Sequence, residues 1–153
     1  MTAPQPTVFA NSHLYDKDFY LWIETTAKQL KEGRFTEVDL ANLIEEIESM
    51  GRSEKRALES NLVVLLIHLL KYKYQSEKRT NSWLSTIFEH RRRINKNLQD
   101  SQSLKNYFAE QFMECYQDAR QLAALETGLN LETFPVESFL TVDECLNQEF
   151  LPD

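Results

Sequence analysis

The sequence is poor in glycine, proline and cysteine, and each shortage excludes a class of fold. With 3 glycines and 4 prolines in 153 residues, the chain lacks the turn residues that a β-sandwich or β-barrel needs between its short strands. Its 2 cysteines, Cys115 and Cys145, form no Cys-x-x-Cys pair and no Cys/His spacing typical of a metal finger. We therefore expect two buried thiols in a reducing cytoplasm rather than a disulfide scaffold.

Long hydrophobic runs are also missing. The longest covers residues 62–67, far short of the ~20 apolar residues that a membrane-spanning helix needs. Residues 1–12 contain Pro4 and Pro6 but no basic segment followed by an apolar one, so no secretory signal is expected. Hydrophobic residues still make up 42% of the chain and aromatic residues 11%, too many for a disordered polyanion. We expect a cytoplasmic, globular protein that does not enter the membrane.

Apolar residues recur at three- and four-residue steps, which predicts amphipathic helices. A first helix is expected over residues 15–30, with Gly33 as its stop; a second is expected to be capped by Thr36 and to end at Gly51. Ser53 then caps a third helix that runs to about Gln75. The apolar face predicted for the second helix consists of Leu40, Leu43, Ile44, Ile47 and Met50.

The second half of the chain continues the helical pattern. The third helix is apolar on almost all faces over residues 58–70, which places it at the centre of a bundle. A fourth helix follows a polar link at residues 76–81, and a fifth begins at Ser101 or Ser103 and stops at Gly128. The sequence thus predicts an all-α fold: one domain over residues 1–153 with about five main helices, an irregular N-terminus over residues 1–13, a short helix over residues 142–146 and an aromatic tail packed on the outside.

Several motifs resemble one family closely. The likeness begins at the segment Tyr15-Asp16-x-Asp18-Phe19-Tyr20-x-Trp22 and extends over almost the whole chain. The other matching segments are Asp39-Leu40-x-Asn42-Leu43-Ile44-Glu45-Glu46-Ile47-Glu48-Ser49-Met50-Gly51-Arg52-Ser53, His68-Leu69-Leu70-Lys71, Ser82-Trp83-x-x-Thr86-Ile87, Arg91-x-x-Ile94, Glu126-Thr127-Gly128-Leu129 and Phe134-Pro135. They identify the chain as similar to the bacterial domain-of-unknown-function family 29. This resemblance implies an all-helical fold and no established activity.

Charge is unevenly distributed along the chain. The total of 17 basic and 24 acidic side chains gives a net charge of −7. Residues 51–105, however, hold 12 basic and 5 acidic side chains, whereas residues 1–50 hold 4 and 9, and residues 106–153 hold 1 and 10. Two interpretations are open: the basic middle lies against its acidic neighbours within the chain, or it offers a face to an anionic partner.

Five polar residues fall on or beside predicted apolar faces and form a candidate buried cluster. Arg91 shares a face with Ile87 and Ile94, and Glu126 shares one with Phe108 and Cys115. Because a buried charge without a partner is expensive, we expect Arg91 to pair with Glu46 or Glu126. His68 is expected to form a hydrogen bond inside the bundle. The candidate cluster is Glu46, Asn61, His68, Arg91 and Glu126, with either a structural or a ligand-binding role.

Cations alternate with aromatic residues in the basic middle, a pattern that suits contacts to phosphates and stacked bases. Lysine and arginine at helix ends also stabilise the helix dipole, which explains the same residues without a ligand. The candidate anion-binding or nucleic-acid face consists of Lys71, Lys73, Lys78, Arg79, Arg92, Arg93 and Lys96, interleaved with Tyr72, Tyr74 and Trp83.

Reactive motifs are absent from the sequence. It contains no Gly-x-Ser-x-Gly elbow, no phosphate-binding glycine loop, and no Glu-x-x-His or His-x-x-x-His pair of the kind that holds a metal. No cofactor is therefore expected, and catalysis is unsupported. The function that the sequence favours is a small binding or regulatory module with a protein partner. Nucleic-acid binding is the alternative, a metal-dependent enzyme with a site inside the bundle the third interpretation, and self-association is left open.

Overall fold

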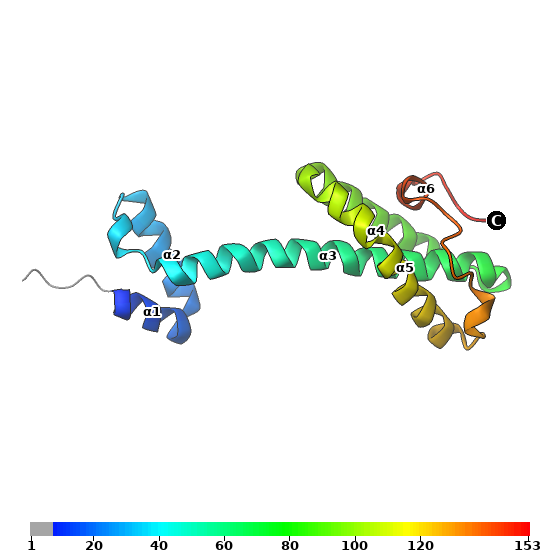
Figure 1. Cartoon of the computed structure of the whole chain (residues 1–153), viewed down its shortest axis with the longest axis horizontal. Helices are drawn as coiled ribbons and strands as arrows, with labels where there is room; N and C mark the ends of the chain where they lie inside the picture. Colours follow the sequence, from blue (N-terminus) through cyan, green and yellow to red (C-terminus); the bar gives the residue numbers. More distant parts are fainter. Residues whose placement is uncertain (1–7) are drawn as a thin grey trace, which may run out of the picture. The chain divides into compact units, whose positions relative to one another are not determined.

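The computed structural model describes the backbone of residues 8–153 and the side chains of residues 13–153 (Figure 1). Within these residues every regular element is helical, and no strand is present. The prediction of an all-α fold is therefore confirmed. The α-helices are α1 (Val8–Lys17), α2 (Phe19–Lys31), α3 (Leu40–Tyr74), α4 (Asn81–Asp100), α5 (Lys105–Thr127) and α6 (Val142–Leu146); short 3-10 helices are η1 (Phe35–Glu37), η2 (Ser76–Lys78), η3 (Gln102–Leu104) and η4 (Leu131–Thr133).

Backbone contacts divide the chain into two compact units, and the boundary between them in the sequence falls within α3. The N-terminal unit ends at Ser53, and the C-terminal unit runs from Glu54 to Asp153. Each unit is described by itself below. The single helical domain expected over residues 1–153 remains a prediction.

The first predicted helix is interrupted at Asp18. α1 ends at Lys17 and α2 begins at Phe19, because the Asp18 side chain accepts a hydrogen bond from the Leu21 amide at 3.0 Å and so caps α2. The predicted irregular N-terminus, residues 1–13, lies outside the described residues up to Thr7. From Val8 the backbone is already in α1, where no glycine or proline interrupts the helix.

The predicted break at Gly51 is wrong. α3 runs without interruption through Gly51 and Ser53 for 35 residues, so Ser53 caps nothing. Gly51 lacks the positive φ of a helix stop, whereas Gly33 and Gly128 have φ values of +73° and +71°. A glycine inside a helix costs only about 1 kcal/mol relative to alanine, and the flanking residues are adequate helix formers. The chain therefore continues through it.

The start of α3 is also displaced from the expected cap. Thr36 lies in η1, and α3 begins at Leu40, directly after Asp39. The Asp39 carbonyl accepts the Leu43 amide at 3.0 Å, and its carboxylate binds the side chain of Asn42 at 2.7 Å. Asp39 thus occupies the capping position that we assigned to Thr36.

Local signals later in the chain predicted the elements correctly. Gly33 follows the end of α2, and Gly128 ends α5 in the left-handed conformation. The hydroxyl of Thr80 accepts the Trp83 amide at the start of α4. α6 has the predicted bounds, and Thr141 and Glu144 form a capping box at its start.

The C-terminal unit has a closed hydrophobic core. Leu65, Leu66, Leu69 and Leu70 of α3 are completely buried. They pack with apolar residues of α4, α5 and the tail in one cluster of 19 buried residues. In the tail Phe134 is fully buried, and Phe139 and Phe150 pack against the same cluster. The predictions of a central third helix and of a packed aromatic tail agree with this core.

The N-terminal unit has no comparable core. Trp22 and Val38 are its only buried large apolar residues among the described side chains. The predicted inward face of its second helix is largely exposed: Leu40, Ile44, Ile47 and Met50 have exposed fractions of 61%, 46%, 59% and 66%. The assignment of these four residues to a core is wrong, because the described elements of this unit do not cover them.

No described helix, from α1 to α6, is both long enough and apolar enough to cross a bilayer.

Candidate functional site

Arg91 is buried and is held by backbone carbonyls rather than by a carboxylate. Its guanidinium donates to the carbonyl of Cys145 through Nε at 2.7 Å, to that of Phe150 through Nη1 at 2.7 Å, and to that of Glu144 through Nη2 at 3.4 Å. The carbonyls of Glu144 and Cys145 belong to the end of α6, and that of Phe150 to the tail; the Glu144 carbonyl also accepts the Asn147 amide at 3.3 Å. Burial lowers the pKa of Arg91, but an arginine remains charged at neutral pH.

The predicted ion pair of Arg91 is therefore wrong. Glu126 is about half exposed and pairs with Lys71, with 3.4 Å between Oε2 and Nζ. Glu46 accepts a hydrogen bond from the Tyr15 hydroxyl, which raises the pKa of Tyr15 to about 12. Glu126 stays outside the core because it lies in the last turn of α5, beyond the final buried residue of that helix, Ala123.

His68 is half-buried on α3. Its Nδ1 lies 2.9 Å from the carbonyl of Val64, so the predicted hydrogen bond is made within its own helix. Burial lowers the pKa of His68, and the positive charge of Lys71 lowers it further, against the opposing effects of the Val64 carbonyl and Glu126. The neutral ring with hydrogen on Nδ1 is therefore favoured at pH 7.

These residues do not assemble into one polar cluster. His68 and Glu126 are close enough to interact electrostatically, whereas Arg91 is committed to the tail and Asn61 is half-buried elsewhere on α3. Among the described side chains, no group of three histidines, cysteines or carboxylates is arranged to hold a metal ion.

Most cations of the candidate nucleic-acid face have partners within the chain. Arg92 and Arg93 both bind Glu89, at 2.7 Å and 3.0 Å, and lower the pKa of this carboxyl to about 2. The guanidinium of Arg79 lies 4.0 Å from the centre of the Tyr72 ring and donates to the Tyr72 carbonyl at 2.8 Å.

The lysines of this face divide into two groups. Lys71 lies over the Trp83 ring at 4.9 Å, and Lys73 lies over the Phe139 ring at 5.7 Å. Lys78 and Lys96 are exposed. The alternation of cations and aromatics in the sequence therefore reflects packing inside the unit, where each aromatic ring named here is half-buried.

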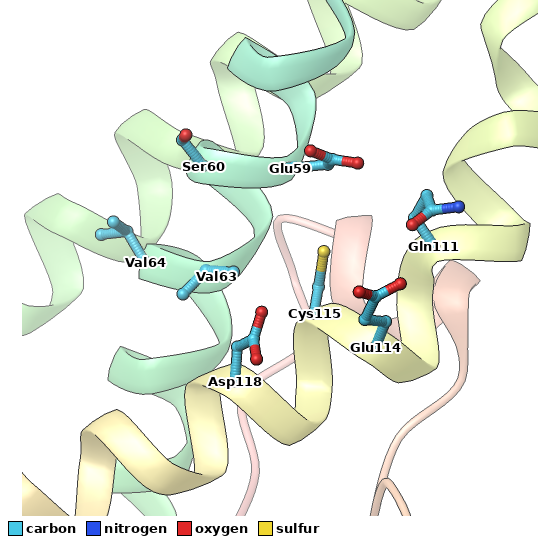
Figure 2. Close-up of a pocket in the computed structure, with 8 residues that line it drawn as sticks. All are labelled: Glu59, Ser60, Val63, Val64, Gln111, Glu114, Cys115 and Asp118. Atoms are coloured by element: carbon cyan, nitrogen blue, oxygen red, sulfur yellow. The ribbon is translucent and has the colours of Figure 1, made fainter.

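A pocket of about 420 Å³ lies between α3 and α5 (Figure 2). The carboxylates of Glu59, Glu114 and Asp118 and the thiol of Cys115 line it. Burial, reinforced by these three carboxylates, raises the pKa of Cys115 to about 11. The thiol is therefore protonated at neutral pH and is a poor nucleophile.

The sequence analysis did not single out the acidic residues of this pocket. Glu114 and Asp118 lie one turn apart on α5, but such spacing is common on any exposed helix face. The Tyr107 hydroxyl donates a hydrogen bond to Glu59, so this carboxylate already has a partner.

An apolar groove of about 300 Å³ lies in the N-terminal unit, between α2 and the first turns of α3. Its walls contain a single charged residue, Glu46. We refer to it as the N-terminal groove; its lining residues are Phe19, Trp22, Ile23, Thr26, Ala27, Leu30, Leu43, Glu46, Ile47 and Met50.

The groove has a fixed floor. The Trp22 indole N–H donates to Asp39 at 3.2 Å, which ties α2 to the start of α3. The Trp22 ring packs edge to face on Tyr15 at 5.0 Å and stacks on Phe19 at 5.8 Å. Trp22 is 3% exposed, whereas Ile23 and Ile47 beside it are 42% and 59% exposed. The groove thus combines an anchored base with apolar walls that water can reach.

Periodicity does not reveal this groove, because it shows which residues share a face and not what covers that face. The available signal was the density of apolar residues at helical spacing in residues 19–30 and 40–50.

A family model described as domain of unknown function DUF29 matches residues 14–151. The match confirms the resemblance that the sequence motifs indicated. Comparisons with curated proteins and with solved structures find no match to the chain.

Proposed function

We propose that this chain, which belongs to the family of domains of unknown function DUF29, is a cytoplasmic helical binding module that takes a protein partner in its N-terminal groove. The groove itself is the observation that carries the proposal: about 300 Å³ of apolar space with a single charged residue in its walls. A cytoplasmic location is supported by the two cysteines, which are unpaired and buried.

The exposed apolar surface of the N-terminal unit supports a macromolecular partner. Ten of the 18 exposed large hydrophobic side chains that the structure describes lie in this unit, although it contributes about a third of the chain. Five of these ten line the N-terminal groove together, and contiguous exposed apolar surface marks an interaction site, since monomers rarely leave much of it in water. Covering a half-exposed leucine or isoleucine contributes about 1 kcal/mol, so several such residues supply a useful affinity.

The charges of the C-terminal unit favour this proposal over nucleic-acid binding. Arg79, Arg92 and Arg93 are engaged within the chain, as are Lys71 and Lys73. A phosphate would have to compete with these partners, which reduces the gain from counterion release.

Site-specific photo-crosslinking tests the proposal. A photoreactive phenylalanine analogue is placed at Ile23, in the groove, and at Leu125, which is 79% exposed on α5, as the control. In cells of the source organism, we expect a discrete protein adduct from position 23 and none of the same mass from position 125. Absence of a groove-specific adduct would contradict the proposal.

Reconstitution completes the experiment. The crosslinked protein is identified by mass spectrometry, purified and titrated against the wild type and against Ile47→Glu, which places a charge in the groove wall. We expect the variant to bind at least about tenfold more weakly, because an unpaired carboxylate in an apolar contact is costly. Circular dichroism of Ile47→Glu checks that the change leaves the helix content unchanged.

A further inference from the structure

The shape of the N-terminal groove suits a helix as its occupant. The groove is lined by one face of α2 and by one face of α3, at positions spaced three and four residues apart. From Phe19 to Leu30 the α2 wall extends about 16 Å, the length of roughly three helical turns. Amphipathic helices bind such grooves by inserting apolar residues at the same helical spacing.

The charges beside the groove are predominantly acidic. Asp18 directly precedes Phe19 of the groove, while Glu24 and Glu48 directly follow Ile23 and Ile47. Glu46 lies in the wall itself. Two cations directly adjoin lining residues, Lys28 after Ala27 and Lys31 after Leu30.

Three of the five cations of this unit lie close to carboxylates that do not line the groove. Arg34 binds Glu32 at 2.9 Å, and Arg52 binds Glu45 at 2.7 Å. Lys28 lies 4.0 Å from Glu32. By contrast, the acidic residues Asp18, Glu24, Glu46 and Glu48 form no ion pair among the described side chains. The groove is therefore apolar inside and negative at its edges.

A second copy of the chain is a poor occupant for this reason. Two copies of the groove, placed face to face, would bring Glu24, Glu46 and Glu48 of one copy toward the same carboxylates of the other. Like charges across an interface oppose association. A basic partner avoids this repulsion and is attracted to the acidic edges of the groove.

We propose that the occupant of the N-terminal groove is an amphipathic helix of about three turns with leucine-like residues on one face and lysine or arginine on its flanks. This inference rests on the proposed function and specifies the chemistry of the partner. The apolar face fills the space between α2 and α3, and the basic flanks lie beside Glu24 and Glu48.

Trp22 provides a reporter for the test. The chain has 2 tryptophans, so the variant Trp83→Phe leaves Trp22, in the groove, as the sole indole. Two tryptophan-free probe peptides of about 14 residues are titrated, with identical leucine faces. One carries lysine on its flanks, and the other carries glutamate at the same positions.

We expect the lysine-flanked peptide to shift the Trp22 emission and to bind at least about tenfold more tightly than the glutamate-flanked peptide. Raising the salt concentration should reduce the difference in affinity between the two peptides. Ile47→Glu should weaken binding at least about tenfold, while Leu125→Glu, which adds the same charge outside the groove, should leave it unchanged. The double variant Glu24→Lys/Glu48→Lys should reverse the preference between the two peptides.

Three results would overturn the inference. Equal binding of both peptides would show that the flanking charges play no part. Failure of both peptides to bind would show that the groove does not accept a helix, while the photo-crosslinking at position 23 still decides the proposed function separately. A wild-type dimer in light scattering that Ile47→Glu converts to a monomer would identify a second copy as the occupant.

Discussion

The two units of the chain use apolar residues in opposite ways. The C-terminal unit buries 19 of them in one cluster, whereas the described part of the N-terminal unit buries two and exposes ten. Both units are helical and both have amphipathic helices, so secondary structure does not distinguish them. The difference is that the core of the C-terminal unit is completed by its own tail, while no described element of the N-terminal unit covers its apolar face.

The largest effect is expected from Arg91→Met in the C-terminal unit. The substitution removes three hydrogen bonds to the carbonyls of Glu144, Cys145 and Phe150 and weakens the attachment of α6 and the tail to α4. We expect the free energy of unfolding, measured in urea, to fall by about 3 kcal/mol or more. Arg92→Met, the matched change on the adjacent exposed arginine, should have little effect. An equal loss in the two variants would refute the role assigned to Arg91.

A second pair of variants compares the two units directly. Leu66 is fully buried in the C-terminal unit, and Ile47 is 59% exposed in the N-terminal groove. Leu66→Ala should cost about 2–5 kcal/mol of unfolding free energy because it leaves a cavity. Ile47→Ala should cost less than about 0.5 kcal/mol in the isolated protein. Chemical denaturation measures both, and a large loss for Ile47→Ala would mean that this residue is covered.

Replacing two glycines of different conformation by alanine should change the free energy of unfolding by smaller amounts, with opposite signs at the two positions. Gly51 is helical and Gly128 has φ +71°, and at both positions an added Cβ meets no atom within 4 Å. Gly51→Ala should stabilise the protein by up to about 1 kcal/mol and raise its helix content. Gly128→Ala should destabilise it by about 1 kcal/mol, since alanine disfavours the left-handed region. Destabilisation by Gly51→Ala would instead indicate a turn within α3.

The smallest effect is a pH dependence from His68. Burial lowers the pKa of His68 in the folded state, so the unfolded chain binds the proton more readily. The stabilisation from the neutral ring is complete above the unfolded pKa of about 6.5 and is lost as the pH falls through that value toward the lower folded pKa. Urea titrations between about pH 7.5 and about pH 5 should show a steeper loss for the wild type than for His68→Gln. If the free energy of unfolding falls with pH equally in the wild type and in His68→Gln, His68 is not the cause of the pH dependence.

The elements that the sequence predicted correctly are those with local signals. An apolar repeat after a polar link predicted α4, and Gly128 predicted the end of α5; α6 has the expected bounds. Gly51 is helical, whereas Gly128 is left-handed. A glycine ends a helix only when the residues that follow it are not helical. The neighbours of Gly51 in α3 are compatible with the helix, so the glycine is retained within it.

The candidate site was harder to predict because its contacts are distant or have no sequence signature. Arg91 was correctly placed in the interior, but its partners are backbone carbonyls 53 to 59 residues away, which any sequence can supply. Conversely, Glu126 follows the apolar spacing of α5 and is nevertheless exposed, because the buried residues of α5 end at Ala123. Spacing predicts a face, and only the surrounding elements determine how far along the helix that face is covered.

The exposed middle of α3 has a consequence for how this chain tolerates change. All seven residues from 51 to 57 are exposed. Apart from the surface contacts of Arg52 with Glu45 and of Lys55 with Tyr107, this part of the helix relies on its backbone hydrogen bonds and on the helix propensity of its residues. Substitutions that keep helix propensity should pass there almost unnoticed, whereas a proline would divide α3 without disturbing any core residue. Substitutions in one unit should therefore have little effect on the stability of the other, provided that residues 51–57 remain helical.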